Sequence, residues 1–123
     1  MRQSADQMVE KIKVTEQLQL DGSLFLDGDT NSTDASAISI DPIYGTTWIT
    51  TAAAETRTLA NGIEGQVKFI ACLTYTDDCV ITPVNLTGTY TTITLNQVGD
   101  SWLGVFKNGS WITIALGGSA ALA

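Results

Sequence analysis

Residues 102–116 are WLGVFKNGSWITIAL, two apolar runs separated by a short polar stretch. Asn108-Gly109 at its centre favours a two-residue hairpin turn, because both residues tolerate a positive φ at little cost. The flanking runs are rich in Trp, Val, Ile and Phe, which are typical of strands. This stretch therefore predicts a β-hairpin with strands at 102–107 and 111–116.

Similar strand signals recur at short intervals upstream, starting near Gly45. Runs rich in Thr, Val and Ile alternate with turn-forming residues, and Pro83 marks an edge or a bulge because proline cannot donate to a sheet. Strands are predicted at 46–51, 55–59, 66–74, 79–86 and 90–95. The sequence thus predicts an all-β fold, an antiparallel β-sandwich or barrel over residues 42–116, with a small, flexible tail at 117–123.

The N-terminal residues predict a short helix. Ser4 can cap this helix, and Gln7, three residues later, completes a capping box. Three apolar side chains then share one helical face: Met8, Val9 and Ile12. So short a helix is marginal alone, so we expect this face to dock on another protein.

Beyond the helix the apolar period changes from 3.6 to 2. The apolar residues fall on even positions: Val14, Leu18, Leu20, Leu24 and Leu26. Residues 14–26, called the stem segment below, are therefore predicted to form an extended, stem-like strand, and Asp21-Gly22 fits either a three-residue loop or a strand that continues. One apolar edge cannot be buried within one chain, but three copies can bury it together. The sequence predicts a trimer, with residues 1–41 as docking helix and arm.

A polar connector follows at residues 27–41. Four of its residues have the spacing of calcium ligands: Asp27, Asp29, Asn31 and Asp34. The EF-hand pattern fails, because Ser32 stands where glycine is needed and Ile38 where glutamate is needed. The sequence therefore predicts a solvated loop and no metal site.

The charge balance excludes several classes of protein. The chain has 6 Lys+Arg against 13 Asp+Glu, a formal net charge of −7 and a pI near 4.1. Such a chain repels phosphate backbones, so no nucleic-acid partner is expected. No apolar run approaches the ~20 residues that span a bilayer, and the N-terminus lacks the apolar core of a signal peptide. We therefore expect no membrane partner, and synthesis in a cytoplasm without export.

No set of catalytic residues stands out, so no enzyme and no cofactor are predicted. The chain has no histidine, and the adjacent carboxylates Asp77-Asp78 would point to opposite faces of a strand. Glu55, Glu64 and Asp100 are each typical of strand ends or turns. The sequence also lacks a phosphate loop, a dinucleotide fingerprint and a GxSxG motif.

The two cysteines, Cys72 and Cys79, have six residues between them. Without histidine they fall short of a zinc site. If a turn falls near Tyr75, they face each other across a hairpin and can form a disulfide. In a reducing cytoplasm they stay free thiols. The sequence leaves both states open.

Five motifs follow one another in the second half of the chain: GQVKFI at 65–70, VITP at 80–83, TTITL at 91–95, VGDS at 98–101 and WITI at 111–114. Their order resembles a module of tailed-bacteriophage virion proteins. In that family the module ends short tail or head fibres and forms decoration subunits. Residues 14–29, VTEQLQLDGSLFLDGD, are similar to the short repeats of trimeric fibre stems.

The resemblance implies a virion structural protein, a capsid decoration (cement) or head-fibre subunit on the capsid surface that is made in the host cytoplasm. Its partners would be further copies of itself in a homotrimer, and the major capsid protein or other virion subunits. The alternative is the receptor- or glycan-binding tip of a fibre, which would use Trp and Tyr side chains on outward loops. A calcium-dependent adhesion module is a third reading. Trp102 and Trp111 are predicted to lie in the core or in a subunit contact.

Replacing Leu18, Leu20 and Leu24 with serine is expected to dissociate the trimer, because it removes most of the apolar edge that the copies would bury together. Light scattering of the purified protein measures the mass directly. A variant that remains trimeric would show that the stem segment does not hold the subunits together.

Overall fold

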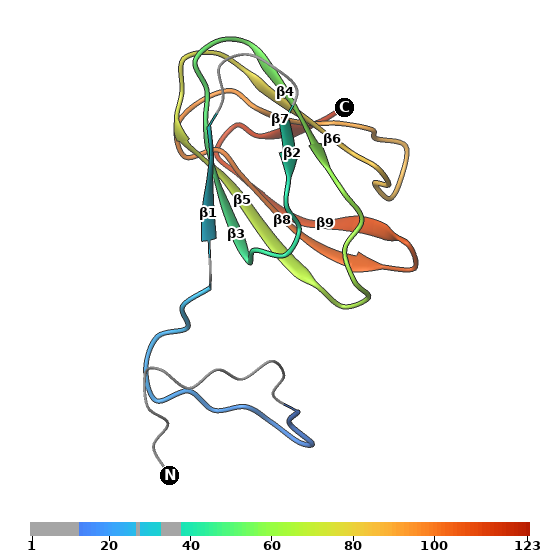
Figure 1. Ribbon diagram of the computed structural model, residues 1–123. Coiled ribbons are helices and arrows are strands. Elements are labelled where there is room, and N and C mark those ends of the chain that lie inside the picture. Colours follow the sequence, from blue (N-terminus) through green and yellow to red (C-terminus); the bar gives the residue numbers. More distant parts are fainter. Residues whose placement is uncertain (1–12, 27, 33–37) are drawn as a thin grey trace.

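The computed structural model describes residues 13–26, 28–32 and 38–123, and in them the chain is all-β. Ten strands form two five-stranded sheets that pack as a sandwich (Figure 1). Sheet A has the order β1-β3-β5-β8-β9 and sheet B the order β10-β7-β6-β4-β2. The strands are β1 Gly28–Ser32, β2 Ile38–Ile40, β3 Thr46–Thr50, β4 Glu55–Leu59, β5 Val67–Thr74, β6 Cys79–Pro83, β7 Ile93–Leu95, β8 Ser101–Lys107, β9 Ser110–Gly117 and β10 Ala121–Leu122.

The first six strands alternate between the two sheets. Neighbours within a sheet therefore run parallel, β1 with β3 and β5 in sheet A, and β2 with β4 and β6 in sheet B. The chain winds around the core like a short β-helix, and β7 to β10 then close both sheets with antiparallel pairs. The all-β prediction is confirmed, but the purely antiparallel arrangement is wrong. Alternation along a strand reports which side chains are buried and says nothing about the direction of the neighbouring strand.

Successive turns of this winding are joined at their corners. The loop 51–54 leads from sheet A to sheet B, and the loop 75–78 makes the same crossing one turn later. Thr51 Oγ1 donates a hydrogen bond to the carbonyl oxygen of Asp77 at 2.9 Å and accepts one from the backbone N–H of Thr76 at 3.0 Å. These bonds hold the two loops in contact. They thereby fix the position of one turn of the winding relative to the next.

All seven predicted strands are present, but the predicted boundaries of the module are wrong at both ends. The predicted connector at 27–41 contains β1 and β2, so the sandwich begins at Gly28 and not at residue 42. The predicted flexible tail contains β10, which pairs with β7, and the carbonyl oxygen of Ala123 accepts a hydrogen bond from Thr91 N at 2.7 Å. These three strands are short, five residues or fewer. In β2 the alternation Ile38-Ser39-Ile40 covers a single period, and β1 and β10 show none, so the sequence signal is too short to separate them from loops.

The hairpin predicted at Asn108-Gly109 is confirmed. Both residues have a positive φ, 54° and 77°, as the tight turn requires. The carboxylate of Glu64 accepts hydrogen bonds from both backbone N–H groups, at 3.1 and 3.3 Å. The turn is therefore capped from a distant part of the chain, and the pairing of β8 with β9 follows from it.

An aromatic group fills one half of the core. Trp111 makes edge-to-face contacts with Trp102 and Phe106, with ring centroids 5.8 and 5.2 Å apart. Each indole N–H is satisfied, Trp102 by Thr113 Oγ1 and Trp111 by the carbonyl oxygen of residue 60, both at 2.9 Å. The prediction that the two tryptophans lie in the core is confirmed. The buried apolar residues around them are Ile40, Ile49, Leu59, Ile70, Cys72, Cys79, Ile81, Ile93 and Leu95.

A buried lysine also lies in the core, on β5 opposite Gly104 of β8. Lys68 is fully buried, and its Nζ donates to the carbonyl oxygens of Asp41 and Tyr44 at 3.0 and 2.7 Å and to Thr47 Oγ1 at 2.7 Å. Burial lowers the pKa of Lys68, while the nearby carboxylates of Asp29 and Asp41 oppose this shift. The three bonds tie the turn between β2 and β3 to β5.

A buried ion pair connects β4 to the neighbouring strands. Arg57 Nη2 lies 3.1 Å from Glu55 Oε2, and Arg57 Nε donates to Asn31 Oδ1 at 2.6 Å. All three side chains are buried. Polar contacts inside the sandwich therefore join β1 to β4, across the two sheets.

Replacing Trp111 with alanine is expected to lower the free energy of unfolding by about 3–5 kcal/mol, because it leaves a large cavity and an unpaired carbonyl group. Chemical denaturation monitored by circular dichroism measures the change. The matched control is Tyr90→Ala, which truncates a ring that is 46% exposed and should cost less than about 1 kcal/mol. Equal costs for the two variants would contradict the placement of Trp111 in the core.

Candidate interaction surface

The two outer faces of the sandwich differ sharply in chemistry. Sheet B presents mainly hydroxyl groups: Thr58 lies beside Thr82, while Val80 lies between Thr56 and Thr94. The outward threonines of sheet B are Thr56, Thr58, Thr82 and Thr94. Threonine suits a solvated sheet face, because its branched side chain fits the pleat and its hydroxyl bonds to water. Sheet B therefore has the character expected of the solvent side.

Sheet A presents an apolar surface, with side chains from four strands aligned in rows. Val67 lies beside Val105, and Val105 beside Ile112. The next row joins Phe69 to Leu103. We call this surface the apolar face and define it as Trp48, Val67, Phe69, Ala71, Leu103, Val105, Ile112 and Ala115. None of these residues is charged, and Trp48 and Phe69 are 43% and 39% exposed.

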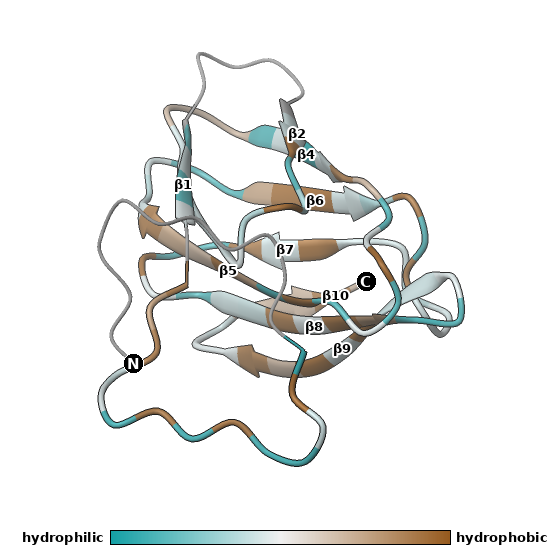
Figure 2. Ribbon diagram, turned by 60° about the horizontal axis from the view of Figure 1, so that its bottom comes forward, coloured by the Kyte–Doolittle hydropathy of each residue, from teal (hydrophilic) through white to brown (hydrophobic). Residues whose placement is uncertain are grey.

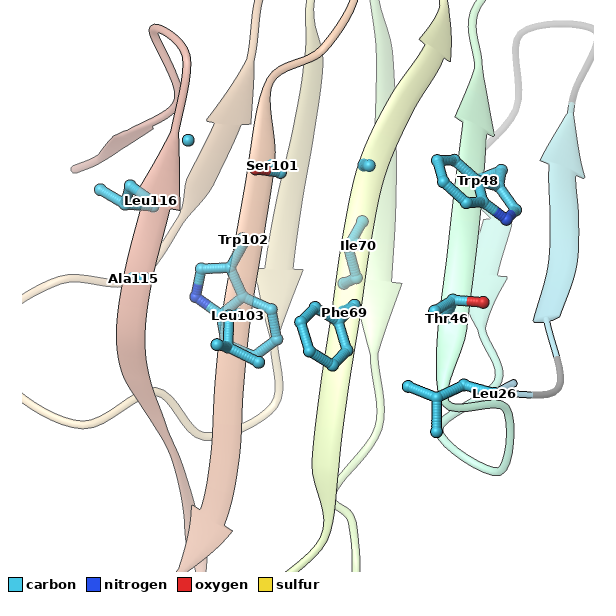
Figure 3. Close-up of a pocket in the computed structure, with 12 residues that line it drawn as sticks. Leu26, Thr46, Trp48, Phe69, Ile70, Ser101, Trp102, Leu103, Ala115 and Leu116 are labelled. Atoms are coloured by element: carbon cyan, nitrogen blue, oxygen red, sulfur yellow. The ribbon is translucent and has the colours of Figure 1, made fainter. Parts of the chain in front are cut away.

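A hollow of about 440 Å³ lies on the apolar face, over β3, β5, β8 and β9. In Figure 3, Phe69 and Leu103 lie side by side on adjacent strands, with Trp48 and Thr46 on the next strand and Leu26 beside them. The lining residues are Leu26, Thr46, Trp48, Phe69, Ile70, Ala71, Ser101, Trp102, Leu103, Ala115, Leu116 and Gly117. The side chains of this set carry few hydrogen-bonding groups, so the hollow favours an apolar occupant.

The stem segment reaches the apolar face at one point. Leu26 packs over Gly45, where an added Cβ would lie 3.0 Å from the Leu26 Cβ. The rest of the segment lies apart from the two sheets (Figure 1), and Leu18 and Leu24 are 63% and 66% exposed. The predicted stem strand is not formed in the single chain, because residues 13–26 have no neighbouring strand to bond to.

The predicted stem residues share this exposure. Val14, Leu20 and Leu26 are each more than 40% exposed, and Phe25 is the most exposed large apolar residue among those that the structure describes. The predicted helix, with its face of Met8, Val9 and Ile12, lies outside the described residues. Of the predicted stem residues, all of them described, the structure brings only Leu26 into the surface described here.

The two cysteines lie in different sheets, Cys72 on β5 and Cys79 on β6. The hairpin under which they would face each other is not formed, because β5 and β6 lie in different sheets and do not pair. Both are buried free thiols. Burial raises the pKa of Cys79 to about 11, with Arg57 opposing the shift, and burial also raises the pKa of Cys72, together with the nearby Asp100. Both thiols are thus held in their unreactive, protonated form.

The carboxylates considered for catalysis are separated in the structure. Glu55 pairs with Arg57 in the core, and Glu64 caps the hairpin turn. Asp100 is buried just before β8, where burial alone would raise its pKa. Hydrogen bonds from the backbone N–H groups of residues 96 and 119 and from a serine hydroxyl outweigh burial, so its pKa is lowered. Each carboxylate thus stabilises a turn or a core contact.

Across residues 13–26, 28–32 and 38–123, no three His, Cys, Asp or Glu side chains gather in an arrangement suited to a metal ion. The same residues contain no helix long and apolar enough to cross a membrane. A scan against protein-family models finds no matching family, and no curated protein matches the sequence. Among the described residues, the apolar face with its hollow is the candidate interaction surface.

Both native cysteines are expected to react with a thiol reagent at pH 8 far more slowly than in unfolded protein. For Cys79, a pKa of about 11 leaves roughly 100-fold less thiolate than an ordinary thiol has at this pH. The matched control is Thr82→Cys on the solvent side of sheet B, which should react at the unfolded rate. Fast modification of the native chain would contradict the buried placement, and an unfolded chain without free thiols would show that the disulfide forms.

Proposed function

We propose that the protein is a structural subunit of a tailed-bacteriophage virion, a capsid decoration or head-fibre protein that binds and stabilises the capsid as a homotrimer. The observation that carries this proposal is the contrast between the two outer faces of the sandwich. The outer face of sheet A is apolar, and that of sheet B is rich in threonine. A single chain presents one solvated side and one side that needs a protein contact. The resemblance of its motifs to virion modules supplies the class of particle.

The physical argument rests on the apolar face being a group of neighbouring apolar side chains that carries no charge. Monomeric soluble proteins rarely expose large contiguous apolar patches, and such patches mark contact surfaces. Completing the burial of Trp48, Val67 and Phe69 would contribute about 1 kcal/mol or more from each side chain, roughly half the value for full burial. Added to the exposed leucines of the stem segment, this favours a subunit of an assembly over a free monomer.

Contact with the capsid is assigned to the N-terminal residues in this proposal. Met8, Val9 and Ile12 would bind the major capsid protein or another virion subunit, while the sandwich stands outward. This division leaves the apolar face and the stem segment for contacts between copies of the chain. The threonine face would then meet solvent at the particle surface.

The second candidate function is the receptor- or glycan-binding tip of a fibre. Exposed Trp48 favours it, because a sugar ring can stack on an indole. The hollow beside Trp48 counts against it, since only Thr46 and Ser101 bring side-chain hydroxyls to the lining. Glycan sites need several convergent polar groups to fix orientation. Clear binding of the isolated protein on a glycan array would promote this second function.

The test is binding to particles produced without the protein. Purified wild-type protein is expected to sediment with such particles, to add density at symmetry-related positions in electron micrographs, and to raise the temperature at which they release their genome. A variant with Met8→Ser, Val9→Ser and Ile12→Ser should stay in the supernatant, while Thr82→Asp binds as the wild type does. Failure of the wild type to sediment with particles would overturn the proposed function.

A further inference from the structure

The apolar face has almost no cover within the part of the chain that the structure describes. Leu26 occupies the β3 side of the hollow, over Gly45. The rest of the lining runs from Phe69 on β5 to Leu103 on β8 and Leu116 on β9 (Figure 3), and Phe69 and Leu116 are 39% and 42% exposed. Some apolar segment is needed to complete this surface.

The stem segment has the length and the pattern for this role. In residues 18–24 the leucines fall on even positions, with Gly22 between them, and the odd positions are Gln19, Asp21 and Ser23. Seven extended residues span about 23 Å, whereas β3 to β9 cover three strand spacings, about 14 Å. An extended segment of this kind can cross the hollow with its leucines inward and its polar side chains outward.

The same chain is poorly placed to supply that cover. Leu26 is anchored over Gly45. From there the chain toward residue 18 would have to reverse its direction immediately to lie over the hollow of its own subunit. Residues 23–26 are Ser-Leu-Phe-Leu and contain neither glycine nor proline, so they favour an extended chain over a tight reversal. Phe25 is 89% exposed and the segment runs away from both sheets (Figure 1).

The hydropathy pattern fits a contact between copies. Figure 2 shows apolar and polar residues alternating along the stem segment, and largely apolar stretches in β5 and β9. The apolar face carries no charge, so it imposes no repulsion on a chain with a net charge of −7. If each copy gives one segment and receives one, a closed ring of copies leaves no apolar face open.

We propose that residues 18–24 of a second copy lie across the apolar face, with Leu18, Leu20 and Leu24 in the hollow. The chain thus exchanges its stem segments between subunits, and each subunit keeps its own Leu26 as the anchor from which the segment departs. This inference rests on the proposed function for its trimer, and it names the contact that would hold that trimer together.

The test is cross-linking in a mixed oligomer of the full chain. One copy carries Leu20→Cys and a second, heavy-isotope copy carries Phe69→Cys, and the two are unfolded and refolded together. A short bismaleimide is expected to join position 20 of the light chain to position 69 of the heavy chain, identified by peptide mass. The matched control replaces Phe69→Cys with Thr82→Cys on sheet B and should give no such product.

Three outcomes would overturn the inference. In a second sample, in which light and heavy chains both carry Leu20→Cys and Phe69→Cys, products joined only within one chain would mean that each subunit covers its own face. Products joining position 69 to position 69, without any at position 20, would mean that two apolar faces pack on each other. The absence of any cross-linked product would mean that residues 18–24 do not lie on the apolar face. If circular dichroism shows that Phe69→Cys disturbs the fold, Leu103→Cys serves as the receiving position.

The result is independent of the capsid, because the experiment contains only this protein. Inter-chain products together with failure to sediment with particles would remove the proposed function and keep the exchange of segments. Sedimentation with particles, in the absence of inter-chain products, would keep the proposed function and remove the exchange of segments.

Discussion

The backbone pairing of strands that alternate between two sheets is the constraint on which the rest of the structure depends. Each crossing of the chain from sheet A to sheet B adds one parallel strand to a ladder, so β1, β3 and β5 stack in one sheet and β2, β4 and β6 in the other. Parallel pairs need a crossover, and here the crossover is itself a strand of the opposite sheet. This winding brings Lys68 and Arg57 inward, where hydrogen bonds to neighbouring turns satisfy both charges. Breaking one such contact would leave a buried charge without a partner, which is costly.

The winding also decides which side chains face outward. The aromatic group of Trp102, Phe106 and Trp111 fills the space between the sheets, so the alternate residues Leu103 and Val105 must lie on the outer face of sheet A. The outer face of sheet B carries threonine at the corresponding positions. This asymmetry is the physical basis for treating sheet A as a contact surface. A sandwich meant to stand alone in water would carry polar side chains on both outer faces.

Much of the fold was accessible from sequence, because strong local signals marked it. The Asn108-Gly109 turn and the β-branched runs placed seven strands, and the alternation of Trp102 with Phe106 pointed to the core. The short strands β1, β2 and β10 were not predicted, since two to five residues are too few for a strand period to stand out from the polar residues around them. The alternation in β5 placed Val67 and Phe69 on one side of the strand and Lys68 and Ile70 on the other. It did not show which of the two sides faces the core. A lysine on the buried side is unexpected until its three oxygen partners are known. The apolar face, which depends on that choice, was therefore missed as a site.

The sequence by itself determined the class of structure, an all-β chain with a tight hairpin, and an apolar period of two in the stem segment. These are local properties, set by the φ preferences of Asn and Gly, by strand periodicity and by composition. Only the tertiary structure decided the parallel winding, the inward lysine and the contrast between the two outer faces. Those features depend on which distant strands become neighbours, and backbone hydrogen bonds between strands are indifferent to the side chains that a sequence displays.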